Sequence, residues 1–184
     1  MTNRLASLSN ALAATVVSAV VGNGALSWDS RLAEIDPGFA SHDAWPTQEA
    51  TLADLFSHRS DLHEHAGDRL EDLGFGQDEV TRRLRFLTPE YRFHGGYAYT
   101  NFGLSAAAYA AARAAGMSWA DLSASRVCEP LEMTRTSLRF AVYIAGPQQA
   151  GPPGWARRNV GHPPHPTQTR RPTTPRRRQP NPSR

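Results

Sequence analysis

The chain has 184 residues, 40% of them hydrophobic, which is enough for one ordinary domain with a buried core. All 20 basic residues are arginines, so any chemistry that depends on a lysine amine is excluded. The single Cys128 excludes an intramolecular disulfide, and no apolar run approaches the roughly 20 residues that span a bilayer.

The first apolar segment predicts a buried helix. Ser9 or Asn10 can cap a helix that continues to about Val21, and its residues are apolar nearly all the way round, as in a core helix. A secretion signal is the alternative, because Arg4 precedes the apolar run. Polar residues interrupt that run and Gly22-Asn23-Gly24 ends it like a helix stop, so the core helix is favoured.

Turns and one short helix are predicted between residues 27 and 76. Pro37-Gly38 marks a turn. Thr51 followed by Asp54 is a capping box, which predicts a short helix through Phe56. A loop of histidines, acids and glycines completes the stretch.

Residues 77–103 combine an amphipathic helix with a loop. Val80, Leu84 and Leu87 recur at i, i+4 and i+7, with acids before them and arginines among them, as a helix dipole prefers. The following stretch, TPEYRFHGGYAYTNFG, contains proline and paired glycines among aromatic residues. This composition predicts a loop or short extended structure.

Two further helices and a possible strand are predicted after this loop. The alanine-rich run from Leu104 to Ala115 predicts a helix that Gly116 ends. A capping box that starts at Ser118 opens a second helix, which ends near Cys128. The run SLRFAVYIA, residues 137–145, then predicts a possible strand, so the ordered part is mostly helical.

The composition changes abruptly at residue 146. Residues 146–184 hold 10 of the 14 prolines and 8 of the 20 arginines, without one acid. Such a segment lacks the apolar residues that would offset its ordering entropy, so we predict a disordered Pro/Arg-rich tail after a partial domain of residues 1–145. Residues 1–145 have 12 arginines against 17 acids, a net charge of −5, so the pI of about 9.5 comes from the tail.

Three patches in fixed order, LADLFSHRSDL, YAYTNFG and EPLEMTRTSL, resemble the serine β-lactamase-related family. This family includes class C β-lactamases, penicillin-binding D-alanyl-D-alanine carboxypeptidases and related esterases. Its members show a leucine-rich segment ending His-x-Ser/Thr-Gly-Leu, then Tyr-x-Asn followed by Gly, then Pro-Leu-Gly-Met-x-x-Thr. The resemblance, from about Ala6 to Leu138, implies an α+β, β-lactamase/transpeptidase-like fold in fragmentary form, with mainly the helical part retained and most of the antiparallel sheet missing.

The resemblance also implies roles for four residues. The family's nucleophile lies in Ser-x-x-Lys at the start of an apolar helix, and the equivalent stretch SLSN puts Ser7 at the nucleophile position and Asn10 at the lysine position. Tyr99-Thr100-Asn101 resembles Tyr-x-Asn. In the family this implies proton transfer by the tyrosine, here Tyr99, and substrate binding by the asparagine, here Asn101.

Departures from the family pattern argue against activity. Asn10 has no basic atom to accept the serine proton. Nothing after Leu138 matches the family's third motif, Lys-Thr-Gly or His-x-Gly. Asp61 and Glu132 add side chains where the family has glycine. The sequence therefore predicts a truncated member of a serine hydrolase family whose reaction passes through an acyl-serine on a β-lactam, a D-Ala-D-Ala peptide or an ester. In this chain that activity is expected to be lost.

A non-catalytic binding protein is the alternative, since the arginine-rich tail can attract nucleic acid or an acidic partner by counterion release. No aromatic interleaving or folded nucleic-acid module supports nucleic acid as the partner, so a solvated tail without a dedicated partner is favoured. If the chain is active, its partner is expected to be a small-molecule or peptide substrate. The reading frame has no convincing signal peptide and, as it stands, indicates a cytoplasmic protein.

No metal or cofactor is expected. His58, His63, Glu64 and His65 invite a metal site, but no remote ligand is evident, so solvated loop histidines are favoured. Cys128 is expected to be a core residue rather than a reactive thiol.

Overall fold

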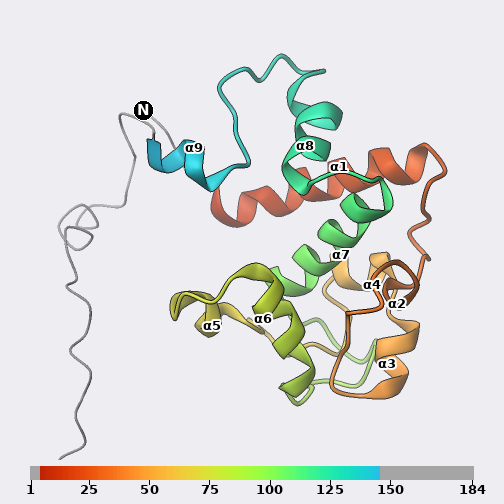
Figure 1. Ribbon diagram of the computed structural model, residues 1–184. Helices are drawn as coiled ribbons and strands as arrows, with labels where there is room; N and C mark the ends of the chain where they lie inside the picture. The colour runs from red at the N-terminus through yellow and green to blue at the C-terminus, as the bar shows by residue number, and fades with distance from the viewer. Residues whose placement is uncertain (1–4, 146–184) are drawn as a thin grey trace, which may run out of the picture. The chain divides into compact units, whose positions relative to one another are not determined.

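The computed structural model of the chain describes residues 5–145, apart from three side chains in its last helix (Figure 1). The described residues form the α-helices α1 (Ser9–Gly22), α2 (Leu32–Ile35), α3 (Ala44–Glu49), α4 (Leu52–Phe56), α5 (Asp68–Asp72), α6 (Gln77–Arg83), α7 (Asn101–Ala114), α8 (Trp119–Ser123) and α9 (Phe140–Ala145). They also include the 3-10 segments η1 (Ala6–Leu8) and η2 (Leu84–Phe86) and the π-helical segment η3 (Ala124–Cys128). The tail predicted at residues 146–184 lies outside the described residues.

Helix α7 is the element on which the others pack. It contacts α1, α2, α4, α6 and α8, and in Figure 1 α1 and α8 lie above it and α2 to α6 below it. Its buried residues are mostly alanine: Phe102, Gly103, Leu104, Ala106, Ala107, Ala108, Ala110, Ala111 and Ala112. Small side chains let neighbouring helices approach closely, so an alanine-rich sequence suits a helix surrounded by others.

The first turn of α7 begins three residues before the predicted start. Thr100 caps it, because the Thr100 hydroxyl oxygen accepts a hydrogen bond from the Gly103 amide at 3.3 Å. A Cβ on Gly103 would lie 2.8 Å from Leu62 Cδ1, closer than such atoms approach in proteins. Glycine at position 103 therefore lets this turn press against the loop that follows α4. The predicted end of the helix is confirmed, since Gly116 has a φ of 67°.

Helix α1 has the predicted length but not the predicted burial or cap. Its buried residues form one stripe, Ala13, Val16, Val17 and Val20, whereas Thr15 and Ser18 are exposed. The prediction of a helix buried nearly all round is therefore wrong. The cap at Ser9 or Asn10 is wrong too, because η1 runs directly into α1 and leaves no extended residue there to act as a cap.

The shorter predicted signals are confirmed where they depend on local hydrogen bonds. The Thr51 hydroxyl accepts from the Asp54 amide at 3.2 Å and the Asp54 carboxylate accepts from the Thr51 amide at 3.0 Å, which is the predicted capping box of α4. At α8 only half of the predicted capping box forms: the Ser118 hydroxyl accepts from the Asp121 amide at 3.1 Å, but the Asp121 carboxylate accepts from the Ser118 hydroxyl instead of the Ser118 amide. The Phe39 amide donates to the Asp36 carbonyl at 2.9 Å and closes the predicted turn.

Several segments differ from prediction. Helices α2 and α3 lie where only turns were predicted before residue 50. The loop predicted before residue 76 contains α5, which has Asp68 and Glu71 in its first turn, where a helix dipole favours acids. The possible strand at residues 137–145 contains α9 instead. A strand needs a neighbour to pair with, and among residues 5–145 the only β-pairing is an isolated bridge between Arg31 and Thr51.

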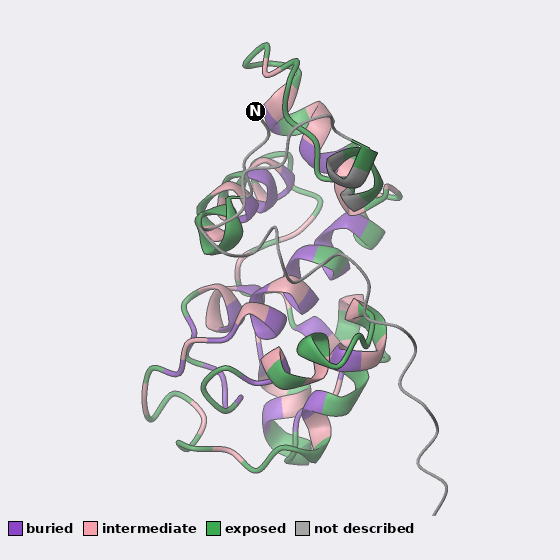
Figure 2. Cartoon of the chain, turned by 90° about the vertical axis from the view of Figure 1, so that its left-hand side faces the viewer, coloured by how far each residue is buried: buried purple, intermediate pink, exposed green. Residues whose placement is uncertain are grey.

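Most helices carry one buried and one exposed face (Figure 2). The larger hydrophobic cluster includes Val17, Leu32, Leu55, Leu84 and Ala107 and so joins α1, α2, α4, η2 and α7. A smaller cluster includes Val16, Leu122 and Val127. Among the described helices, none combines the length and the apolar character that a membrane crossing requires.

Candidate functional site

Three of the four predicted site residues meet in one hydrogen-bonded cluster. The Asn10 side-chain amide donates to the Tyr99 hydroxyl oxygen at 3.0 Å and to Asn101 Oδ1 at 3.2 Å. The Tyr99 hydroxyl in turn donates to Asn101 Oδ1 at 2.7 Å. The fold therefore joins the start of α1 to the start of α7 through these side chains.

Local structure fixes the position of each member of this cluster. Asn10 is the second residue of α1, and Asn101 is the first residue of α7. Tyr99 immediately precedes Thr100, the buried cap of α7, and the Tyr99 carbonyl accepts from the His65 amide at 2.7 Å. The backbone on both sides of the Tyr99 ring is thus held by hydrogen bonds.

The cluster has no charged member, and its three side chains form hydrogen bonds to one another. Asn101 Oδ1 accepts from both Asn10 and Tyr99, and the Tyr99 oxygen both donates and accepts. The amide nitrogen of Asn10 acts only as a donor, since a carboxamide has no basic nitrogen. The side chain at position 10 can therefore hold Tyr99 and Asn101 in place but cannot take a proton from a neighbouring hydroxyl.

Ser7, the fourth predicted site residue, lies in η1, three residues before Asn10. It is exposed, and its hydroxyl makes no hydrogen bond to any residue in the described range. Ala6, directly before it, has a φ of 48°, in the left-handed region that non-glycine residues rarely adopt. The structure thus brings Asn10, Tyr99 and Asn101 together and leaves Ser7 at the exposed entry to α1.

The predicted cluster of solvated histidines is wrong at His58. His63, Glu64 and His65 are exposed, whereas His58 is buried and its imidazole lies against Tyr99, with ring centroids 4.7 Å apart. A signal for its role was available, because His58 is the histidine of the HRSDL patch. In the described part of the chain, no three His, Cys, Asp or Glu side chains are arranged to hold a metal.

The two residues that the resemblance places at family glycine positions, Asp61 and Glu132, have distinctive environments. Asp61 is buried, and its Oδ2 accepts a hydrogen bond from the Ser41 hydroxyl. Burial raises the pKa of the Asp61 carboxyl above its ordinary value of 3.8. Glu132 has a φ of 53°, a left-handed conformation that glycine adopts without strain. Cys128, expected in the core, is a half-buried free thiol.

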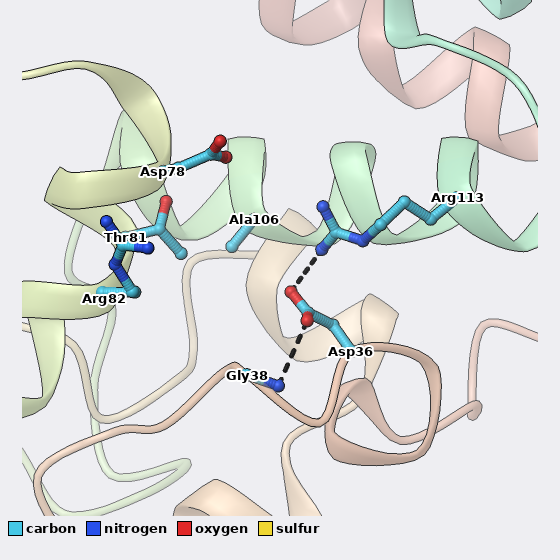
Figure 3. Close-up of a pocket in the computed structure, with 7 residues that line it drawn as sticks. All are labelled: Asp36, Gly38, Asp78, Thr81, Arg82, Ala106 and Arg113. Atoms are coloured by element: carbon cyan, nitrogen blue, oxygen red, sulfur yellow. Dashed lines mark hydrogen bonds and ion pairs between the residues drawn. The ribbon is translucent and has the colours of Figure 1, made fainter.

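A cavity of about 330 Å³ lies beside α7 but apart from the motif residues (Figure 3). It is lined by Asp36, Gly38, Asp78, Thr81, Arg82, Ala106 and Arg113. Arg113 is ion-paired with Asp36, and Arg82 is paired with Glu79. Its arginines are thus already engaged, and we centre the candidate site on Asn10, Tyr99 and Asn101 instead.

Residues 3–174 match the protein family described as Beta-lactamase. Penicillin-binding protein 4 of Amycolatopsis lactamdurans is 38% identical over 76 residues, which cover 41% of this chain and 19% of that protein. The chain therefore spans about a fifth of the length of this relative.

Solved structures show the same fold at low sequence identity. A D-stereospecific amidohydrolase from Streptomyces sp. aligns with a TM-score of 0.62 and 17% identity, over 71% of this chain and 42% of that one. A class C β-lactamase aligns with a TM-score of 0.59 and 21% identity, over 71% and 35%. A penicillin-binding protein homologue from Pyrococcus abyssi aligns with a TM-score of 0.58 and 16% identity, over 78% and 34%.

The fold and the motifs lead to the same conclusion. This chain aligns with less than half of each of these structures, and its described residues are mostly helical, as expected for the helical part of a β-lactamase/transpeptidase-like fold. The family match covers 172 of the 184 residues and includes all three motif patches and the start of α1. The chain belongs to the β-lactamase-related family of serine hydrolases and penicillin-binding proteins.

Proposed function

We propose that this chain derives from an acyl-serine hydrolase and has lost that reaction at Asn10. The observation that carries the proposal is the pair of hydrogen bonds from the Asn10 amide to Tyr99 and Asn101. A carboxamide occupies the place that the family resemblance assigns to a lysine amine. The carboxamide donates hydrogen bonds to its neighbours, but it has no basic atom that could take a proton.

Ser7 is the proposed position of the nucleophile. A serine hydroxyl is a weak nucleophile until a positioned base takes its proton. Asn10 cannot act as this base, and the Tyr99 proton is engaged by Asn101 Oδ1 at 2.7 Å. The chain contains no lysine that could substitute from elsewhere in the sequence.

The expected loss of rate is large. A positioned general base contributes about 10² to 10⁴ in rate, and residues that act as a unit lose more when one is removed. Acylation of Ser7 is therefore expected to be slower than in an active relative by at least this factor. The bond that an intact site would attack is the acyl bond of a β-lactam, a D-Ala-D-Ala peptide or an ester.

The names of the relatives select the probes. One relative is called a penicillin-binding protein and one structural neighbour a D-stereospecific amidohydrolase. A fluorescent penicillin therefore tests the β-lactam bond and a D-amino-acid amide tests the peptide bond. A nitrophenyl ester tests the ester bond. Covalent labelling is the primary readout because it detects acylation even when deacylation fails.

The experiment compares the full 184-residue chain with Asn10→Lys, Ser7→Ala and the double variant. We expect no adduct on the unmodified chain and a penicilloyl adduct on Ser7 in Asn10→Lys, located by mass spectrometry. The double variant is the matched control and is expected to lose the adduct. Circular dichroism checks that each variant remains helical.

Two results would overturn the proposal. Acylation of Ser7 in the unmodified chain would show that Asn10 does not prevent the reaction. A folded Asn10→Lys variant without any adduct would show that position 10 is not where the activity was lost.

A further inference from the structure

The imidazole of His58 packs against the Tyr99 ring, in a position that the proposed function leaves without a role. His58 follows α4 in a left-handed conformation, with a φ of 57°, which histidine adopts more readily than most residues. Only 8% of the residue is exposed. Its backbone carbonyl accepts from the Ala98 amide at 2.9 Å, which ties this turn to the segment before Tyr99.

The side chain makes a second connection to the same segment. His58 Nδ1 accepts a hydrogen bond from the Thr100 amide at 3.3 Å. The ring also packs at 4.7 Å from the Tyr99 ring and at 5.6 Å, edge to face, from the Tyr97 ring. One histidine therefore contacts a stretch of four consecutive residues that ends directly before Asn101.

The hydrogen bond from Thr100 defines the tautomer of His58. A backbone amide only donates, so Nδ1 must present a lone pair and the ring proton must lie on Nε2. Burial lowers the pKa of His58 below its ordinary value of 6.5, which keeps the imidazole neutral at neutral pH. A protonated imidazole would carry a hydrogen on Nδ1 as well. Two N–H donors, Nδ1 and the Thr100 amide, would then point at each other, and the hydrogen bond would be lost.

We propose that His58 is a positioning residue. Its Nδ1 accepts the hydrogen bond from the Thr100 amide and so keeps the Tyr99 and Asn101 side chains within hydrogen-bond distance of Asn10. The inference rests on the proposed function only for the identity of the site, since the geometry itself requires no catalysis. Thr100 stands between Tyr99 and Asn101 and caps α7, so its amide is the point at which both side chains can be fixed together.

Protonation of His58 is expected to release this hold. The titratable groups that face the His58 imidazole are the phenols of Tyr97 and Tyr99. The His65 ring contacts the Tyr99 ring edge to face, with ring centroids 5.6 Å apart. Burial is the sole cause of the lowered pKa, and no charged side chain in the described part of the chain contributes to it. Release is therefore expected at a pH below 6.5.

The first test uses the unmodified full-length chain and no substrate. Histidine ¹⁵N spectra at neutral pH are expected to show His58 as the neutral tautomer protonated on Nε2. The Thr100 amide shift is expected to change with a midpoint below pH 6.5, together with the Asn10 side-chain amide signals. A neutral tautomer protonated on Nδ1, or a Thr100 amide that ignores the titration of His58, would overturn the proposal.

The second test separates the acceptor from the ring. His58→Asn offers an oxygen acceptor in place of Nδ1 and tolerates a positive φ, whereas His58→Phe keeps a ring without an acceptor. We expect Asn to retain slow exchange of the Thr100 amide and to abolish its pH dependence. Phe is expected to speed that exchange about two- to tenfold, the loss of one hydrogen bond.

His65→Asn is the matched control. His65 also has a positive φ, 55°, and also contacts the Tyr99 ring, but it is exposed and does not bond to the Thr100 amide. The control is expected to leave the Thr100 titration unchanged, and equal effects of the His58 and His65 substitutions would refute the assignment. Because these readouts need no acylation, failure of Asn10→Lys to react would leave the role of His58 standing.

Discussion

The family resemblance places Asp61 at a glycine position, and its replacement by asparagine tests whether a buried carboxyl makes folding pH-dependent. The residue is 3% exposed, and the Ser41 hydroxyl donates to its Oδ2. Burial raises the pKa of Asp61, with a smaller contribution from the nearby Asp43 carboxylate. The hydrogen bond from Ser41 lowers the pKa but does not outweigh burial.

The sign of the effect follows from the order in which the two states lose the proton. In the unfolded chain the carboxyl ionises near its ordinary pKa of 3.8, whereas the folded chain keeps the proton to a higher pH. This contribution to stability is therefore fully present below pH 3.8 and is lost as the pH rises through the folded pKa. For one proton, the free energy of unfolding falls by at most about 1.4 kcal/mol per pH unit.

The assay is urea unfolding, followed by circular dichroism, across a pH series for the unmodified chain, Asp61→Asn and the exposed control Asp29→Asn. Taking the difference in unfolding free energy removes the titration of all other groups. The advantage of Asp61→Asn over the unmodified chain should be smallest below pH 3.8 and should grow toward neutral pH, while the control shows no such growth. A difference that is flat with pH, or that shrinks as pH rises, would refute the reasoning.

Three further predictions concern stability and use the same unfolding measurement. Leu55→Ala, at a fully buried position, should cost about 2 to 5 kcal/mol, whereas Leu131→Ala, at a position 66% exposed, should change stability by less than about 0.5 kcal/mol; equal costs would contradict the core assignment. Glu132→Gly should gain about 0.5 to 1 kcal/mol by relieving a φ of 53°, while Glu129→Gly, at a φ of −67°, should lose a similar amount; a loss in both would exclude strain at position 132. Thr51→Ala should cost about 1 kcal/mol through the capping box, and an unchanged midpoint would rule that contribution out.

Local signals in the sequence located most of the helices. The Thr51 capping box and the Gly116 stop act through hydrogen bonds and backbone angles within a few residues, so the neighbouring sequence contains all the information they need. The prediction at residues 137–145 failed for the complementary reason. A strand is defined by its partner, and an apolar run alone does not reveal whether one is present.

The family could also be read from the sequence, because motif order does not depend on packing. The assignment of Asn10 to the family's lysine position stays a prediction. The HRSDL patch marks His58 as a motif residue, but its burial and its hydrogen bond from the Thr100 amide could not be read in this way. Its burial results from the approach of the Ala98–Thr100 segment, and a histidine in a loop looks the same in sequence whether it is solvated or enclosed.

Sequence by itself determined the residue types at the site, the lack of any lysine and the local starts and stops of the helices. Tertiary structure alone decided that Asn10 meets Tyr99, 89 residues away, and that one face of α1, rather than its whole surface, is buried. Short-range preferences act over one or two helical turns. Contacts across such separations depend on how the whole set of apolar faces packs together.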